Sequence, residues 1–295
     1  MSQYYYFVAG LPSLSSEDTK PVYSVARFKA ELETVLTNQD KRIMRWYYMK
    51  YDNRNIISFL RKKTSDDNFD DRGNFSKEVI ETLCSLPKED EDEKGRIPKD
   101  TYVPAYIKKI TKDYFSRIAN EEAIDFHLLE DQLSAAYYKE AMKCGNNFLA
   151  SWFELNLNIR NVLSTVNCRK YGLEKQNYLV GDNSVAEHLR QMRGREFQFD
   201  DSIEYMKDLI HIAEDKDPMT REKRLDALRW KWLDEQTFFT TFDIENLIAY
   251  MLRLEMTERW VMLDKLRGEK TFRQLVADMK QESADTLEEF KENNK

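Results

Sequence analysis

Glycine and proline are scarce in this 295-residue sequence, with 8 and 6 copies respectively. Sheet-rich folds need many turns that contain these residues, so their scarcity favours long helices joined by few connections. Sustained alternation of apolar and polar residues, the pattern of a half-buried strand, is also missing. The sequence therefore predicts an all-α protein.

Cysteine and histidine are rare as well, with three copies of each. Cys84, Cys144 and Cys168 are odd in number, widely spaced and without a CxxC pair, so neither a disulfide framework nor a zinc site is indicated. The histidines form no HExxH motif and no pair of Glu-x-x-His motifs, which a di-iron helical bundle would need. We expect reduced thiols, a cytoplasmic protein and no bound metal.

Long apolar runs are missing too. The longest, YYYFVAGL at Tyr4–Leu11, is far shorter than the roughly 20 residues that span a bilayer. The first three residues include no basic side chain, which argues against a secretory signal. We therefore expect a chain that does not insert into a membrane.

Positive charge is not in excess, because the formal net charge is −7. Nucleic-acid binding needs a basic surface, so a general nucleic-acid partner is not expected. The basic clusters at Arg190–Arg195 and Arg221–Arg224 are interpreted as solvated helix faces. Phosphate-binding motifs of the GxxxxGK[ST] and GxGxxG types and the GxSxG nucleophile motif are absent, so we expect no cofactor and no enzymatic activity.

Helical spacing of apolar residues recurs along most of the chain. The clearest interruption is LPKEDEDEKGRIPKD, Leu86–Asp100, which combines prolines, a glycine and a block of acids and is typical of a linker or exposed loop. A helical pattern resumes near Tyr102, and another runs from Asn146 or Asn147 to the basic turn before Gly172. Further helices are expected at about Pro21–Leu36, Asp40–Lys63, Lys77–Leu83, Glu121–Lys143, Val185–Met192, Ile203–Glu214, Arg221–Glu235, Asp243–Leu266 and from Thr271 onward.

Two of these helical patterns resemble each other. WYYMKYDNRNIISFL begins at Trp46, and WFELNLNIRNVLSTV begins at Trp152. Aligning the tryptophans pairs residues of the same or similar type along both stretches: Arg54 with Arg160, Asn55 with Asn161, Ile57 with Leu163 and Ser58 with Ser164.

A third, degraded copy fits MLRLEMTERWVMLDKLRGEK, where Met251 takes the Trp position, Arg259 the Arg position and Trp260 the Asn position. A period near 100 residues is too long for a solenoid unit. It predicts three related helical-hairpin units at residues 1–95, 96–195 and 196–295.

The repeated Arg-Asn pair has two open interpretations. The apolar stripe of the first copy places Asn53 on its apolar side and Asn55 beyond its edge. Asparagine disfavours helix interiors because its side chain competes for backbone hydrogen bonds, so a recurrent asparagine indicates a fixed partner. One interpretation is a hydrogen bond to a neighbouring helix or loop end, and we favour it for Asn161. The other is a repeated polar surface offered to a partner. For Arg54 and Arg160 we favour binding to a partner or contacts between the units, because burying an unpaired guanidinium is too costly.

These repeats resemble a known family. The pattern consists of long helices that end in D-x-x-N-(I/L)-x-x-x-L-R-x-K and recur three times at intervals near 100 residues. This pattern is similar to that of the C subunit of A/V-type rotary ATPases, whose eukaryotic counterpart is the d subunit. YDNRNIISFLRKK matches with Asp52, Asn55, Leu60, Arg61 and Lys63 in the motif positions.

The later copies are less regular. LNIRNVLSTVNCRKYG has Asn158 for Asp and Asn167 for Arg, and IAYMLRLEMTERWVML spaces Glu255 and Glu258 by three rather than two. The opening YYYFVAGLPSL resembles a shorter bacterial family whose genes are associated with V-type ATPase clusters. The candidate repeat or interface residues are Trp46, Asp52, Arg54, Asn55, Arg61, Trp152, Arg160, Asn161, Glu255 and Arg259.

The resemblance implies a funnel or curved ring with pseudo-threefold symmetry. It also implies a non-catalytic rotor subunit that links the central stalk to the membrane proteolipid ring. Such a protein would be cytoplasmic, peripheral on the inner face of the cell membrane and attached through protein contacts. Two alternatives stay open: a generic helical adaptor or scaffold without ATPase association, and a helical enzyme with a dispersed site.

Overall fold

The computed structural model describes residues 4–16, 18, 23–61, 69–85, 97, 98, 101–192, 194, 197, 199, 203–266 and 268. Every regular element in these ranges is helical, which confirms the all-α prediction. The helix expected from Thr271 onward lies outside the described residues, as does most of Leu86–Asp100. None of the described helices is both long and apolar enough to cross a membrane.

The chain forms two compact units. The central unit is Leu36–Thr240, and the terminal unit joins Gln3–Val35 with Thr241–Lys295. Both boundaries expected from the repeat, after residues 95 and 195, fall within the span of the central unit. The division into three repeated units stays a prediction.

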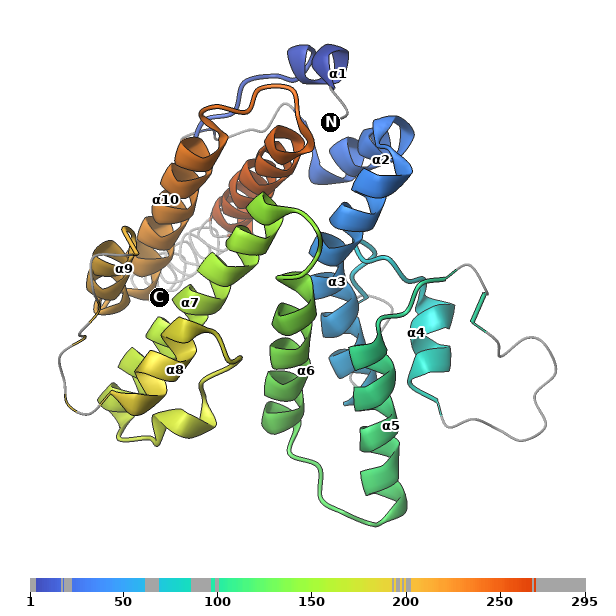
Figure 1. Cartoon of the computed structure of the whole chain (residues 1–295), viewed down its shortest axis with the longest axis vertical. Coiled ribbons are helices and arrows are strands. Elements are labelled where there is room, and N and C mark those ends of the chain that lie inside the picture. Colours follow the sequence, from blue (N-terminus) through green and yellow to red (C-terminus); the bar gives the residue numbers. More distant parts are fainter. Residues whose placement is uncertain are drawn as a thin grey trace, which may run out of the picture. The chain divides into compact units, whose positions relative to one another are not determined.

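The central unit contains most of the helices (Figure 1). Helix α6 packs against α3, α5 and α7, and α7 also packs against α8 and α9, while α9 packs against α10. Fully buried apolar side chains lie along α3 and α7 at helical spacing, and each contributes about 1.5–3 kcal/mol of burial free energy. The bounds are α3 Asn38–Leu60, α4 Lys77–Leu83, α5 Ala105–Ala119, α6 Phe126–Ala141, α7 Asn147–Tyr171, the short 3₁₀ helix η3 Lys175–Asn177, α8 Ser184–Gln191, α9 Met206–Ala213 and α10 Pro218–Thr237.

Helix ends follow from capping residues. The side chain of Asn146 accepts a hydrogen bond from the N–H of Leu149 at 2.9 Å, and Gly172 ends α7 with φ +68°, so this helix has the expected bounds. The helix expected at Glu121–Lys143 instead begins at Phe126. Asp125 accepts from two backbone N–H groups there, and Glu121 takes φ +57°, which a helix cannot accommodate.

The terminal unit contains α1 (Tyr5–Ala9), α2 (Val25–Val35) and a helix over residues 244–266. Phe28 of α2 is fully buried, and the rings of Phe7, Tyr23 and Tyr250 surround it with centroid distances of 5.9, 5.8 and 4.9 Å. The Tyr250 hydroxyl donates to the carbonyl of Pro12 at 3.0 Å. Segments from both ends of the sequence therefore share one aromatic core.

Candidate functional site

Asn161 lies in the middle of α7 and is fully buried. Its Nδ2 donates to the carbonyl of Val180 at 2.8 Å, and its Oδ1 accepts from the N–H of the same residue at 2.9 Å. The amide thus pairs with both backbone groups of one loop residue, as a neighbouring strand would. The segment that follows α7 is thereby fixed against the helix.

Asn55 of α3 makes the same pair of hydrogen bonds with Asp70, at 2.9 and 3.0 Å. Asn55 is 3% exposed although it lies beyond the edge of the apolar stripe, because it is hydrogen-bonded to the following loop. An asparagine with both amide groups paired can be buried without an unsatisfied donor or acceptor. The hydrogen-bond interpretation of the repeated asparagine therefore accounts for both copies.

One helical turn earlier, each copy holds a second anchor. The carboxylate of Asp52 accepts from the N–H groups of Asn74 and Phe75 at 2.9 and 3.0 Å, just before α4. The equivalent Asn158 accepts from Nδ2 of Asn183, the residue that caps α8, at 2.8 Å. We call Asp52 with Asn55, and Asn158 with Asn161, the two loop clamps.

Glycines sit against both clamps. A Cβ on Gly73 would lie 2.2 Å from Oδ1 of Asp52, so no other residue fits there without displacing the carboxylate. Gly181 has φ +78°, and a Cβ there would lie 3.0 Å from a methyl of Leu157. At both glycines the backbone of the loop therefore lies directly against the long helix.

The third copy differs. Thr257 takes the place of Asp52 and Asn158, and its hydroxyl donates to the carbonyl of Arg253 in its own helix at 3.0 Å. Glu255 is half-buried, and the exposed Arg259 lies over the ring of Trp260, 5.5 Å from its centroid. At this position the threonine bonds its own helix instead of a following loop.

Three of the candidate residues converge on one groove of the central unit. Arg54, Arg61 and Arg160 line a cavity of about 380 Å³ between α3, α6 and α7. Their convergence could not be inferred from the sequence, because it depends on how α6 packs between the two repeats. We call this cavity the basic groove, and its other lining residues are Lys50, Asn53, Ile57, Ser58, Glu130, Leu133, Ser134, Tyr137 and Tyr138.

The two arginines that align in the repeat have different partners. Arg160 donates to the hydroxyl of Ser134 at 3.1 Å and pairs with Asp131, both in the preceding helix α6. Burial raises the pKa of Asp131, and the charge of Arg160 offsets that only in part. Arg54 has a side chain that is 69% exposed and lies 3.6 Å from Asp70 in the following loop.

Arg61, the residue that follows the last turn of α3, also lines the groove. Its guanidinium pairs with Glu130 at 2.9 Å and donates to the carbonyl of Phe126 at 3.3 Å, so the end of α3 is tied to the start of α6.

The two tryptophans lie outside this groove. The carbonyl of Trp46 accepts from the Tyr137 hydroxyl at 3.0 Å, and the buried Trp152 lies 5.7 Å from Trp232, measured between ring centroids. Both serve packing.

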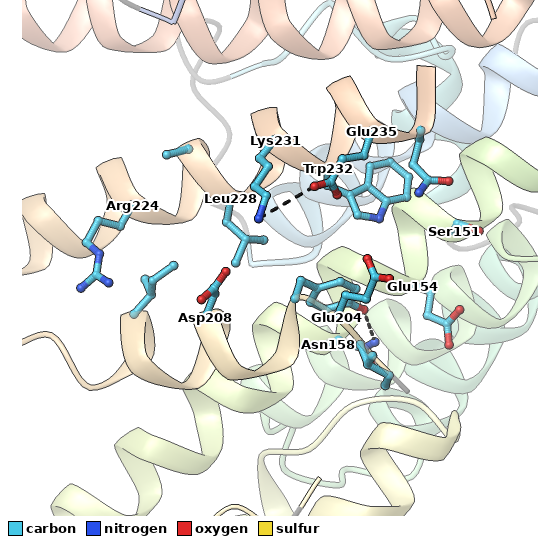
Figure 2. Close-up of a pocket in the computed structure, with 15 residues that line it drawn as sticks. Ser151, Glu154, Asn158, Glu204, Asp208, Arg224, Leu228, Lys231, Trp232 and Glu235 are labelled. Carbon is cyan, nitrogen blue, oxygen red and sulfur yellow. Dashed lines mark hydrogen bonds and ion pairs between the residues drawn. The ribbon is translucent and has the colours of Figure 1, made fainter. Parts of the chain in front are cut away.

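A larger cavity, of about 590 Å³, lies between α7, α9 and α10. Figure 2 shows Glu204 and Asp208 from the α9 side, Glu154 on α7, and Lys231 with Glu235 on α10. Lys231 and Glu235 form an ion pair at 3.8 Å. The sequence did not single out this groove, because its carboxylates are a few among 53 acidic residues without a distinguishing motif.

This larger groove shares a residue with the second loop clamp. Nδ2 of Asn158 donates to the Tyr205 hydroxyl at 2.8 Å within it (Figure 2). Arg224, at one end, is held by Asp215 at 2.7 Å. Asn158 therefore connects α7 with the start of both α8 and α9.

Residues 1–283 match the family described as protein of unknown function, DUF2764. The chain belongs to this family. No curated protein and no solved structure gives a significant match.

Across the described ranges, no group of three or more His, Cys, Asp or Glu side chains could hold a metal ion. Burial raises the pKa of all three thiols, that of Cys84 to about 12, so none is a thiolate nucleophile at neutral pH.

Proposed function

We propose that the protein is a non-catalytic rotor coupling subunit of a V-type ATPase, which links the central stalk to the membrane proteolipid ring during ion transport. The observation that carries the proposal is the pair of loop clamps. They occupy the D-x-x-N positions by which the sequence resembles the C subunit of these ATPases, and the last residue of each, Asn55 and Asn161, binds the following loop in the same way.

A subunit that transmits torque needs stiff elements and broad complementary surfaces, and it needs no reactive group. The clamps supply stiffness, because they fix loop backbone to long helices through buried, fully paired polar groups. The two charged grooves supply surfaces that a partner with opposite charges can recognise. The subunit would lie at the cytoplasmic face of the membrane and be held there by protein contacts.

Purification from native membranes tests this function. A tagged chain extracted in mild detergent should bring with it the catalytic, stalk and ring subunits of a rotary ATPase, identified by mass spectrometry. Deleting the gene should leave ATP hydrolysis in membrane vesicles but abolish ATP-driven ion uptake. Recovery of the chain without any ATPase subunit, together with unchanged ion uptake, would overturn the proposal and favour a helical adaptor unrelated to the ATPase.

A further inference from the structure

The larger groove, between α7, α9 and α10, has more negative than positive charge on its walls. Both of its cations already have acidic partners. Arg224 is held by Asp215 at 2.7 Å, and this pair lies at one end of the groove. Lys231 lies 3.8 Å from Glu235 in its own helix. The remaining carboxylates of the groove belong to Glu154, Glu204 and Asp208.

These three carboxylates are available to a ligand. Within the described ranges, none of them accepts a hydrogen bond or forms an ion pair. Glu204 and Asp208 are exposed at the start of α9, and Glu154 is half-buried on α7. No group of acidic side chains in these ranges is close enough to hold one metal ion, so a single small cation would not satisfy all three. Cations spaced along a longer ligand would.

A hydrogen-bond donor is left open in the same groove. Trp232 of α10 is 8% exposed, and its ring packs against those of Phe148 and Trp152. Its indole N–H makes no hydrogen bond within the described part of the chain, yet it is not sealed from solvent there, so it faces the groove that the residue lines. In Figure 2, Trp232 lies on the side of the groove opposite Glu154 and Glu204.

The open N–H and the open carboxylates together narrow the class of ligand. A buried indole N–H usually has a partner, so a ligand that fits should supply an acceptor. A polyamine would pair with the carboxylates, but its charged amines only donate hydrogen bonds. A phosphorylated ligand or a nucleic acid would accept from the indole, but the carboxylates would repel it.

A basic peptide satisfies both requirements. Its backbone carbonyls accept hydrogen bonds, and its lysine or arginine side chains are spaced cations. The cavity of about 590 Å³ lies within the usual size range of ligand sites, so it can hold a short segment of such a chain.

We propose that the larger groove binds a segment of a protein partner that is rich in lysine or arginine, whose cations pair with Glu154, Glu204 and Asp208. A backbone carbonyl of the segment accepts from the N–H of Trp232 and fixes its position in the groove. This inference goes beyond the proposed function, because it states the chemistry of a partner and does not depend on that partner being an ATPase subunit.

The indole N–H signals of the tryptophans give a direct readout in proton–nitrogen NMR spectra. Trp232→Phe removes the N–H and so assigns its signal. A short peptide of alternating lysine and alanine should shift this signal and slow its exchange with solvent, while the signal of Trp46, outside the groove, stays in place. A peptide of alternating glutamate and alanine should change neither signal. Equal protection of Trp232 by spermine, which has no acceptor, would overturn the assignment to a peptide.

Neutral variants of the exposed carboxylates test the charge pairs without disturbing the core. Glu204→Gln and Asp208→Asn should each weaken binding of the lysine–alanine peptide several-fold, and the double variant should weaken it about tenfold. Asp113→Asn, an exposed neutralisation on α5, is the matched control and should stay within about twofold. Higher salt should weaken wild-type binding more than that of the double variant. Absent peptide binding, or equal binding by all these variants, would overturn the proposal.

Site-specific photo-crosslinking separates this inference from the proposed function. A photoreactive amino acid at Ser151, an exposed residue of the groove, should capture in cells a segment rich in lysine and arginine, with the same group at Lys112 on α5 as the control. If ATPase subunits co-purify with the chain but Ser151 captures no basic segment, the groove proposal fails and the function stands. If Ser151 captures a basic segment but no ATPase subunit co-purifies, the function fails and the groove stands.

Discussion

Asn161 and Val180 are 19 residues apart in the sequence and share two hydrogen bonds, one in each direction between side-chain amide and backbone. Replacing Asn161 by Leu keeps the size of the side chain but leaves the N–H and carbonyl of Val180 unpaired in a buried place. The free energy of unfolding should fall by about 1–3 kcal/mol. Urea denaturation measures the loss. Ser164→Ala in the same helix is the control and should stay within about 0.5 kcal/mol.

Asn55→Leu should cost a similar amount, because Asn55 pairs with Asp70 in the same geometry. The two asparagines share no hydrogen-bond partner, so the losses in the double variant should add to within about 0.5 kcal/mol. A double variant that is much less or much more destabilised than the sum would show that the two clamps are coupled.

Gly73→Ala should disturb the first clamp without removing a polar group. Its Cβ would lie 2.2 Å from Oδ1 of Asp52, so the carboxylate that holds Asn74 and Phe75 must move. We expect a loss of about 1–3 kcal/mol, typical of overpacking, and faster hydrogen exchange at the N–H groups of Asn74 and Phe75. Gly10→Ala, whose Cβ would meet nothing closer than 3.6 Å, is the control. Unchanged exchange at the two N–H groups would argue against this contact.

The stability of the fold near the first clamp should also depend on pH, through the carboxylate of Asp70. Burial raises the pKa of Asp70, but the hydrogen bonds and charge of Arg72, with the charge of Arg54, outweigh it and keep the pKa below its ordinary value of 3.8. A lowered folded-state pKa means that the carboxylate stabilises the fold above about pH 4 and that this contribution is lost as the pH falls through the folded-state pKa. Asp70→Asn should therefore be less stable than wild type at pH 7, and the difference should shrink in denaturation curves below about pH 4. A difference that grows on acidification would contradict the assignment.

The thiols should differ in reactivity. Cys84 and Cys168 are buried, whereas Cys144 is half-buried. Ellman's reagent should modify Cys144 first in the native protein and the other two only after denaturation. Because the pKa of Cys84 is raised to about 12, raising the pH from about 7 to about 9 should not expose a fast-reacting thiolate there. Rapid native labelling of two or more thiols would contradict this burial pattern.

Sequence patterns predict some features well because the signal lies in side chains. Helix α7 has nearly its predicted bounds, since Asn146 and Gly172 mark its two ends. The predicted start of α6, Glu121, is too early. Glutamate is common in helices, so the sequence does not mark Glu121 as non-helical, whereas the actual cap of the helix is Asp125. Helix α1 lies in a continuous apolar run that has no period to distinguish it.

The partners of the two loop clamps and the assembly of the basic groove could not be predicted from the sequence. The D-x-x-N residues are visible in the sequence, but Val180 and Asp70 contribute only backbone groups to the asparagine pairs, and every residue has such groups. Arg54 and Arg160 align in the repeat, and nothing in their identity says that one pairs with the following loop and the other with the preceding helix. That difference arises from how the helices pack, which short motifs do not encode.

The two asparagine clamps tolerate connections of different length. Asn55 reaches a residue 15 positions ahead, whereas Asn161 reaches one 19 positions ahead. Closing the longer loop costs only about 0.2 kcal/mol more by the usual logarithmic dependence on length. Because the clamp holds one backbone position of the loop, short insertions between the end of α7 and Val180 should be accepted. This connection is therefore a suitable place to insert a tag or a fluorophore.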